Sequence, residues 1–329
     1  MVYRKGEVQI YVLIYVDDLL ITGSHSDIIQ QLLQLLQQHF PPKQLGPVSN
    51  FLGIQVSTTA AGTFLHQAQY AAELVHAANL QHSKPVQKPI SLKPSTSSDS
   101  SSPFFDPHHY RQLAGSLNYL TITMPDIAYA AHKVCQHMHS PTTADYMAIK
   151  HLLRYINGTL QFGLPLTTAA LQLRSYSDAD WAGDSSDKKS TTSFCTFLGT
   201  TQISWSVKKQ ITVAKSSTEA EYRSLSSATS DIIWIRCLLT DFQLSPPTLT
   251  PLYCDNTSAM AIAHNPVFHA RTKHIEIDYQ FVRHHINNGE ITLHHIHSED
   301  QPADLLTKSL SSSRFQDLRF KLGIRSIHA

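Results

Sequence analysis

The chain has 329 residues, which is enough for two domains with separate hydrophobic cores. Hydrophobic residues make up 42% and charged residues 16%, a balance that excludes wholesale disorder. The formal net charge is +1, so the large basic excess of many nucleic-acid binders is absent and net charge favours no such function.

Residues 1–90 are predicted to form a mixed α/β unit. Residues 8–16 are rich in β-branched and aromatic side chains, as in a buried strand, and a second apolar run at 19–22 follows Asp17 and Asp18. The two runs predict a hairpin with both acids at its tip. A helix and two further strands complete the unit, at residues 28–40, 51–56 and 64–70. Because the chain opens in a strand, we expect a fragment of something longer.

A linker rich in Ser and Pro is expected over residues 91–107. The region after it, residues 108–168, is predicted to be helical, with helices at 110–120, 127–138 and 144–155. The sequence has no run of 18 apolar residues and no signal-peptide pattern at its N-terminus. We therefore expect no membrane span and an intracellular protein, cytoplasmic or nuclear and not secreted.

The C-terminal half is predicted to be a three-layer α/β domain over residues 169–310. Strands followed by alternating helices and strands give this architecture. The strands are expected at residues 173–182, 193–207, 252–255 and 290–297, and the helices at 218–242, 257–264 and 303–310. Residues 311–329 are expected to be a polar, basic tail.

Four carboxylates of this half fall at predicted strand ends or helix starts: Asp178, Glu221, Asp255 and Asp304. Such positions gather along one edge of an α/β sheet. Gathered carboxylates repel one another and need cations to stay ionised. Their oxygen atoms suit Mg²⁺ or Mn²⁺, and two such ions about 4 Å apart can activate a water and stabilise the leaving oxygen of a phosphodiester. The pattern therefore indicates nucleic-acid hydrolysis.

Helical geometry favours Glu221 over Glu219 as the ligand. With Glu221 at zero and about 100° per residue, the apolar positions 225, 228, 232, 235 and 239 fall within about 40° of it. Glu219 falls at about 160° and is expected to point outward near the helix N-terminus. The choice between Asp178 and Asp180 stays open, because both share one face of their strand. Any one of these acids alone would more often be a structural turn or cap residue.

Longer motifs run through both halves of the chain. The C-terminal half contains 176–184 (YSDADWAGD), 217–222 (STEAEY), 253–258 (YCDNTS), 272–278 (TKHIEID) and 303–308 (ADLLTK). Together these segments resemble the ribonuclease H domain of copia-type LTR retrotransposon Pol polyproteins. The N-terminal half contains 15–18 (YVDD), 51–54 (FLGI) and 110–120 (YRQLAGSLNYL). These resemble the reverse transcriptase palm of the same polyproteins and the region that follows it.

The resemblance implies a fold and a set of roles. The fold is a truncated reverse transcriptase palm and a helical thumb or connection region, followed by a ribonuclease H-like three-layer domain with a mixed sheet. The four acids Asp178, Glu221, Asp255 and Asp304 match the family's D-E-D-D metal-binding acids. Two Mg²⁺ or Mn²⁺ ions and an RNA–DNA hybrid are therefore the implied cofactors and substrate. His297 matches a histidine that assists product release in related nucleases, with His294 and His295 as competitors for that role.

Asp17 and Asp18 match the paired acids that bind metal in the polymerase palm. A reverse transcriptase also needs a third palm aspartate well upstream, which this chain lacks. The resemblance therefore implies a polymerase remnant, and we do not expect polymerisation by this chain alone.

Two functional hypotheses follow. The first is an active ribonuclease H that contacts phosphates through basic residues, for which the candidates are Lys188, Lys189, Lys208, Lys209, Lys215 and Arg223. The second is a catalytically silent retrotransposon remnant with at most weak nucleic-acid binding. The missing polymerase half favours the second, and the intact acids favour the first. Departures from the family pattern, such as Met124 where an arginine is usual, suggest a copy that drifts under weak constraint. No membrane partner is expected, and the oligomeric state stays open.

Overall fold

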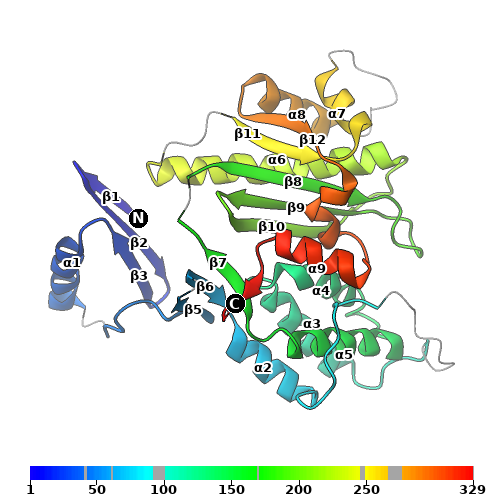
Figure 1. The fold of residues 1–329 in the computed structure, drawn as a ribbon, viewed down its shortest axis with the longest axis horizontal. Coiled ribbons are helices and arrows are strands. Elements are labelled where there is room, and N and C mark those ends of the chain that lie inside the picture. The colour runs from blue at the N-terminus through cyan, green and yellow to red at the C-terminus, as the bar shows by residue number, and fades with distance from the viewer. Residues whose placement is uncertain are drawn as a thin grey trace.

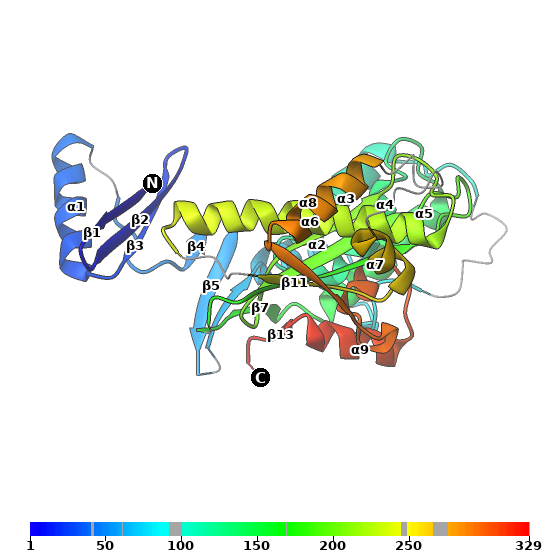
Figure 2. The ribbon, with the colours of Figure 1, turned by 90° about the horizontal axis from the view of Figure 1, so that it is seen from above.

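The computed structural model describes residues 1–40, 43–60, 62–91, 101–168, 170–244, 249–265 and 276–328. A small N-terminal unit stands apart from a larger body in both ribbon views (Figure 1; Figure 2). The body is built on two five-stranded sheets. Within the described ranges, no helix is long and apolar enough to cross a membrane.

The N-terminal unit is a three-stranded antiparallel sheet with one helix. Its elements are β1 (Val2–Lys5), β2 (Val8–Tyr15), β3 (Asp18–Gly23) and α1 (Ser26–His39). Strands β2 and β3 pair up to Tyr15 and Asp18, which confirms the predicted hairpin. Helix α1 has no buried residue, so this unit has little core of its own. It touches the body through Tyr11, whose ring packs against that of Phe242.

An antiparallel sheet of order β13-β7-β6-β5-β4 joins three distant parts of the chain. Its strands are β4 (Asn50–Phe51), β5 (Ile54–Thr59), β6 (Gly62–His66), β7 (Phe162–Leu166) and β13 (Arg325–Ser326). The helices of this part are α2 (Ala68–Ala77), α3 (Pro107–Leu120), η1 (Pro125–Ile127), α4 (Ala128–Cys135) and α5 (Thr143–Asn157). The strand predicted at residues 64–70 is therefore wrong beyond His66. Helix α2 begins at Ala68 because Ala71, Leu74 and Val75 have helical spacing and bury one face.

The C-terminal sheet is mixed and has the order β10-β9-β8-β11-β12. Its strands are β8 (Leu173–Asp180), β9 (Thr191–Leu198), β10 (Thr201–Lys209), β11 (Thr250–Cys254) and β12 (Ile291–His295). The first three are antiparallel neighbours, whereas β11 runs parallel to both β8 and β12. The mixed sheet is as expected, but the segment predicted as strand over residues 193–207 is two antiparallel strands, β9 and β10, joined by a turn at residues 199–200.

Helices cover both faces of this sheet. Helices α6 (Ser217–Asp241), α7 (Thr257–His264) and α8 (Glu276–Asn287) pack on one face, around a core that includes Leu225 and Leu252. The other face is covered by α3, α4 and α5 together with η4 (Pro302–Leu306) and α9 (Ser312–Lys321). One core there contains Leu153, Leu306 and Phe315. Part of one layer of the C-terminal architecture thus comes from residues before 169, outside the predicted domain bounds of 169–310.

Residues 311–328 fold, contrary to the expected tail. Helix α9 buries Phe315 and Leu318, and β13 pairs with β7. The apolar residues of α9 have helical spacing, but they are few and lie among many polar residues. This weak pattern is why the sequence did not predict the helix. The helix predicted at residues 303–310 is shorter than expected, because η4 is a 3-10 turn that ends at Leu306.

The expected linker over residues 91–107 is only partly covered. Residues 92–100 lie outside the described residues. After them, Phe104 is buried and its backbone N–H donates to the carbonyl of Pro141 at 2.8 Å. The last part of the linker therefore belongs to the packed body.

Candidate metal centre

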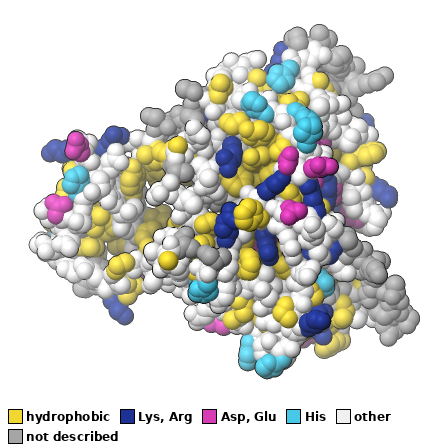
Figure 3. All heavy atoms as spheres, viewed as in Figure 1, with side chains coloured by type: hydrophobic (Ala, Val, Ile, Leu, Met, Phe, Trp, Pro, Cys, Tyr) yellow, Lys and Arg dark blue, Asp and Glu magenta, His cyan; other side chains and the backbone are white. Residues whose placement is uncertain are grey.

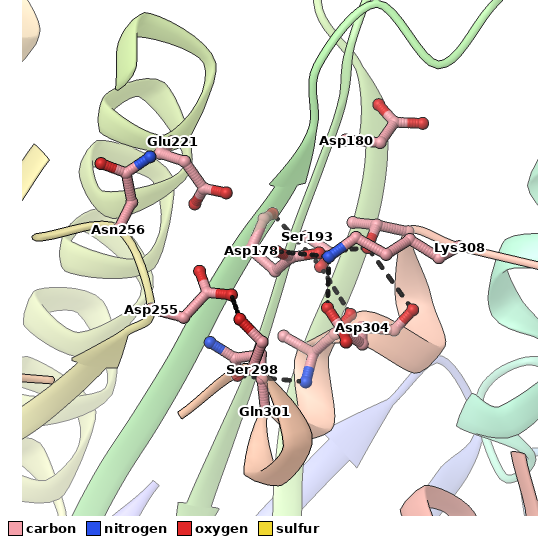
Figure 4. Close-up of polar contacts among 12 residues, drawn as sticks. Asp178, Asp180, Ser193, Glu221, Asp255, Asn256, Ser298, Gln301, Asp304 and Lys308 are labelled. Carbon is pink, nitrogen blue, oxygen red and sulfur yellow. Dashed lines mark hydrogen bonds and ion pairs between the residues drawn. The ribbon is translucent and has the colours of Figure 1, made fainter. Parts of the chain in front are cut away.

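Three acids from three elements meet at one edge of the C-terminal sheet. Asp178 lies near the end of β8, Asp255 directly follows β11, and Glu221 lies in the second turn of α6. Because β8 and β11 are parallel neighbours, their carboxyl ends lie together. Ser216 caps α6 by accepting the backbone N–H of Glu219, which fixes where that helix begins. The side chains of Glu221 and Asp255 are directed toward Asp178 (Figure 4).

The fourth predicted acid, Asp304, reaches the same edge from η4. The ammonium of Lys308 lies 3.2 Å from Asp178 Oδ1 and 2.5 Å from Asp304 Oδ1, so it bridges the two acids (Figure 4). Arg314 of α9 lies 3.2 Å from Asp304 Oδ2. Thr307 Oγ1 donates to Asp178 Oδ2. The structure therefore brings all four predicted acids to one place.

Burial and mutual repulsion raise the pKa of two of these acids. Burial raises the pKa of Asp178 to about 6, with Asp304 and Asp255 contributing and Lys308 opposing. Burial also raises the pKa of Glu221 to about 9, and the charges of Asp178 and Asp255 add to the effect. The protein alone therefore does not stabilise the fully ionised cluster.

The donor atoms fit a hard divalent cation. One carboxylate oxygen each of Glu221 and Asp255 and the Cys254 Sγ lie within 4.8 Å of one another. Burial and the Glu221 carboxylate raise the pKa of the Cys254 thiol, so oxygen is the better donor here. No lysine or arginine in the described part of the chain pairs with Glu221 or Asp255. A bound cation would supply the missing positive charge.

The structure places Asp178 and not Asp180 beside the other acids, and it corrects the expected orientation of one glutamate. Asp180 points away from the other acids and accepts the backbone N–H of Thr191 (Figure 4). Glu219 is buried, although we expected it to point outward. Its carboxylate lies 2.6 Å from Arg223 and accepts the Lys215 N–H at 2.8 Å, so local partners hold it at the helix start.

Three other predicted site residues make no contact with this cluster among the described side chains. Asp17 and Asp18 are exposed at the end of the β2–β3 hairpin, in the separate N-terminal unit. His297 is exposed, and its ring centroid lies 5.4 Å from that of His295. No hydrogen bond or ion pair joins His297 to the four acids among the described side chains.

The six basic candidates lie at the same edge of the sheet as the acids. Lys188 and Lys189 precede β9, Lys208 and Lys209 end β10, and Lys215 and Arg223 flank the start of α6. Acidic and basic side chains gather on this side of the body (Figure 3).

Three of these cations pair with acids within the fold, and one of the three is Lys189, which lies 3.8 Å from Asp187. Lys209 pairs with Asp184 at 2.6 Å and with Asp187 at 3.0 Å, and Arg223 pairs with Glu219. In the described part of the chain, Lys188 and Lys208 are exposed and have no ion pair, so they are the better phosphate candidates.

The sequence reading missed several residues that hold the acids in place. Lys308 and Arg314 pair with Asp304, and Ser298 Oγ donates to Asp255 Oδ2 at 2.6 Å. The spacing of Asp304 and Lys308 was a usable signal, since residues four apart on one helical turn face each other. Nothing in the sequence pattern pointed to Arg314 or Ser298.

Comparison with known proteins gives three kinds of similarity. The family model for reverse transcriptase (RNA-dependent DNA polymerase) matches residues 1–92. The chain is 42% identical over 326 residues to the retrovirus-related Pol polyprotein from transposon RE2 of Arabidopsis thaliana, covering 98% of this chain and 22% of that protein. It is 46% identical over 225 residues to an uncharacterized mitochondrial protein of the same plant, covering 68% of this chain and 93% of that protein.

Among solved structures, the N-terminal RNase H domain of rv2228c from Mycobacterium tuberculosis, fused to maltose binding protein, aligns with a TM-score of 0.32 and 11% identity. The alignment covers 46% of this chain and 98% of that chain. The present chain spans about a fifth of the length of the RE2 polyprotein.

Proposed function

The chain belongs to the Pol polyproteins of copia-type retrotransposons, and we propose that its C-terminal half is a ribonuclease H-type endonuclease that hydrolyses the RNA strand of RNA–DNA hybrids. The observation that carries the proposal is the meeting of Asp178, Glu221 and Asp255 at one sheet edge, beside Asp304. Acids drawn from separate elements into one buried group are unfavourable unless a ligand uses them.

The four acids would hold Mg²⁺ or Mn²⁺, with two ions expected. When bound, such ions activate a water and stabilise the leaving oxygen of a phosphodiester. The contribution of the chain is to fix the ligand oxygens. Thr307 orients Asp178 through its hydroxyl, and Ser298 orients Asp255.

Substrate binding is assigned to the basic residues around the site. Lys188 and Lys208 are exposed beside the acids and would contact phosphates, which makes binding sensitive to salt. Selection of RNA over DNA rests on the 2′-hydroxyl of the cleaved strand. His297 keeps its proposed role in product release.

The preceding parts of the chain are assigned by the same membership. We propose that residues 1–90, which the reverse transcriptase family model matches, are the end of a palm, and that residues 108–168 are a thumb or connection region. Polymerisation is not part of the proposal. Asp17 and Asp18 are exposed, and no third acid, histidine or cysteine groups with them among the described residues.

The test uses the full chain, because the core beneath Asp304 includes residues before 169. A labelled RNA–DNA hybrid is incubated with Mg²⁺ or Mn²⁺ and native protein, Asp255→Asn or Asp241→Asn. The Asp241 carboxylate is exposed at the end of α6 and provides a matched control. We expect metal-dependent cutting of the RNA strand, lowered at least about 100-fold by Asp255→Asn and unchanged by Asp241→Asn.

Duplex DNA of the same sequence should remain uncut. Folded native protein that cuts no hybrid, or an Asp255→Asn variant that cuts as well as native, would refute the proposal. A catalytically silent remnant would then be the better description of the chain.

A further inference from the structure

Lys308 holds two of the four acids with a single positive charge. Its Nζ lies 3.2 Å from Asp178 Oδ1 and 2.5 Å from Asp304 Oδ1. The lysine side chain is 39% exposed, whereas both acids are buried, so a partly exposed side chain carries the ammonium that contacts both acids (Figure 4). A bridge between two acids from different elements is more than the usual pairing of side chains along one helix.

The charges of the site are balanced on one side only. Asp178 and Asp304 share the Lys308 ammonium, and Asp304 also has Arg314 at 3.2 Å. Glu221 and Asp255 lie on the other side of Asp178 and pair with no lysine or arginine in the described ranges (Figure 4). A first divalent cation would therefore bind beside Glu221 and Asp255, because no lysine or arginine neutralises their negative charges.

An ammonium group and a divalent cation cannot use the same carboxylate oxygens together. Mg²⁺ requires oxygen ligands at about 2.0–2.1 Å in octahedral geometry, which leaves no space for an ammonium between the same two acids. Lysine is a compact, strongly hydrated charge on a flexible stem, so it can leave such a position without moving the backbone.

We propose that Lys308 is a tethered cation that competes with the second divalent ion for Asp178 and Asp304. The first ion binds beside Glu221 and Asp255, and the second is admitted only when Lys308 withdraws. This inference rests on the proposed function, because it assigns an order to the ions of that site. Its alternative is an ordinary surface ion pair, which would leave ion binding unchanged when removed.

The experiment counts bound Mn²⁺ on the full chain after chelator treatment, by titration with electron paramagnetic resonance of the free ion. Native protein is compared with Lys308→Gln, Lys308→Arg and Lys321→Gln. Lys321 pairs with the exposed Asp300 at 2.6 Å, so its variant removes a lysine–aspartate pair outside the acid cluster. Thermal melting of each variant verifies that it is folded.

We expect native protein to bind one Mn²⁺ tightly and a second weakly. Lys308→Gln should tighten the second site by about tenfold or more, because it removes a unit charge at contact distance. Lys308→Arg keeps the charge and should bind the second ion as weakly as native protein, and Lys321→Gln should match native protein. A second site that is unchanged or weaker in folded Lys308→Gln would overturn the inference.

The binding readout separates this inference from the proposed function. Suppose that hydrolysis depends on Asp255 and that Lys308→Gln leaves the Mn²⁺ affinity of the second site unchanged. The proposed competition would then be refuted, whereas the proposed nuclease function would remain supported. Protein that binds no Mn²⁺ at all would overturn both.

Discussion

Removal of the Tyr155 hydroxyl tests whether α9 is joined to the helical region by buried polar contacts. Tyr155 of α5 is buried, and its hydroxyl donates to Asp126 Oδ2 while it accepts from Arg319 of α9 at 2.9 Å. The other oxygen of Asp126 has no hydrogen-bond partner among the described residues. Tyr155→Phe keeps the ring and removes both bonds.

The expected loss of unfolding free energy is about 2–4 kcal/mol, because a hydrogen bond to a charged group contributes about 1.5–3 kcal/mol and a second bond is lost with it. The loss should also depend on pH. Burial raises the pKa of Asp126, and the bond from Tyr155 opposes that rise. An acid whose folded pKa exceeds its unfolded value loses stability as pH rises through the folded pKa. Since Tyr155→Phe raises the folded pKa further, its effect should grow between pH 4 and pH 9.

The assay is urea unfolding followed by tryptophan fluorescence at both pH values. Tyr129→Phe is the matched control, because Tyr129 is buried and its hydroxyl makes no hydrogen bond to the described residues. The control should change the free energy by less than about 0.5 kcal/mol. A Tyr155→Phe effect that is equally small, or independent of pH, would refute the reasoning.

Three further predictions concern the acids and the core beneath them. In chelator at pH 8, Glu221→Gln should raise the melting temperature by about 5 °C, because a rise of two pKa units alone costs about 3 kcal/mol of stability. The gain should vanish near pH 4, because the native protein loses stability only as pH rises from the unfolded pKa of 4.5 toward the folded pKa of about 9. A variant whose melting temperature at pH 8 is no higher than that of native protein would contradict this reasoning. Ser298→Ala should weaken Mn²⁺ binding and hydrolysis by about 10–100-fold, because Asp255 loses its orienting bond; equal Mn²⁺ affinity by titration would exclude that role. Leu306→Ala should lower the unfolding free energy by about 2–5 kcal/mol, whereas Leu249→Ala at a side chain that is 49% exposed should change it by less than about 0.5 kcal/mol; similar urea midpoints for the two would argue against the shared core.

The C-terminal sheet and its acids were predictable because their signals are local. Helix α7 has the predicted bounds, and β8 begins at the predicted residue, Leu173. The choice of Glu221 followed from the apolar stripe below it, and Leu225 and Ile232 of that stripe are fully buried. Hydrophobic periodicity predicts a helix or strand correctly where that element buries one of its faces.

The remaining features depend on partners far away in the sequence. Strand β7 is short and stable only because β6 and β13 pair with it from residues 62–66 and 325–326. Helix α9 has few apolar residues, and they are buried by helices near residue 150. Arg314 reaches Asp304 only because α9 folds back over η4, which no local pattern encodes.

Because the C-terminal segment is folded, intact acid motifs alone do not show that a gene copy encodes a complete site. A copy that lost the codons for residues 312–327 would still encode all four acids and every motif around them. Its product would lack Arg314, the pairing of β13 and the apolar residues that pack beneath η4. Surveys that score such elements by their acids alone would therefore count copies whose proteins cannot hold those acids in position.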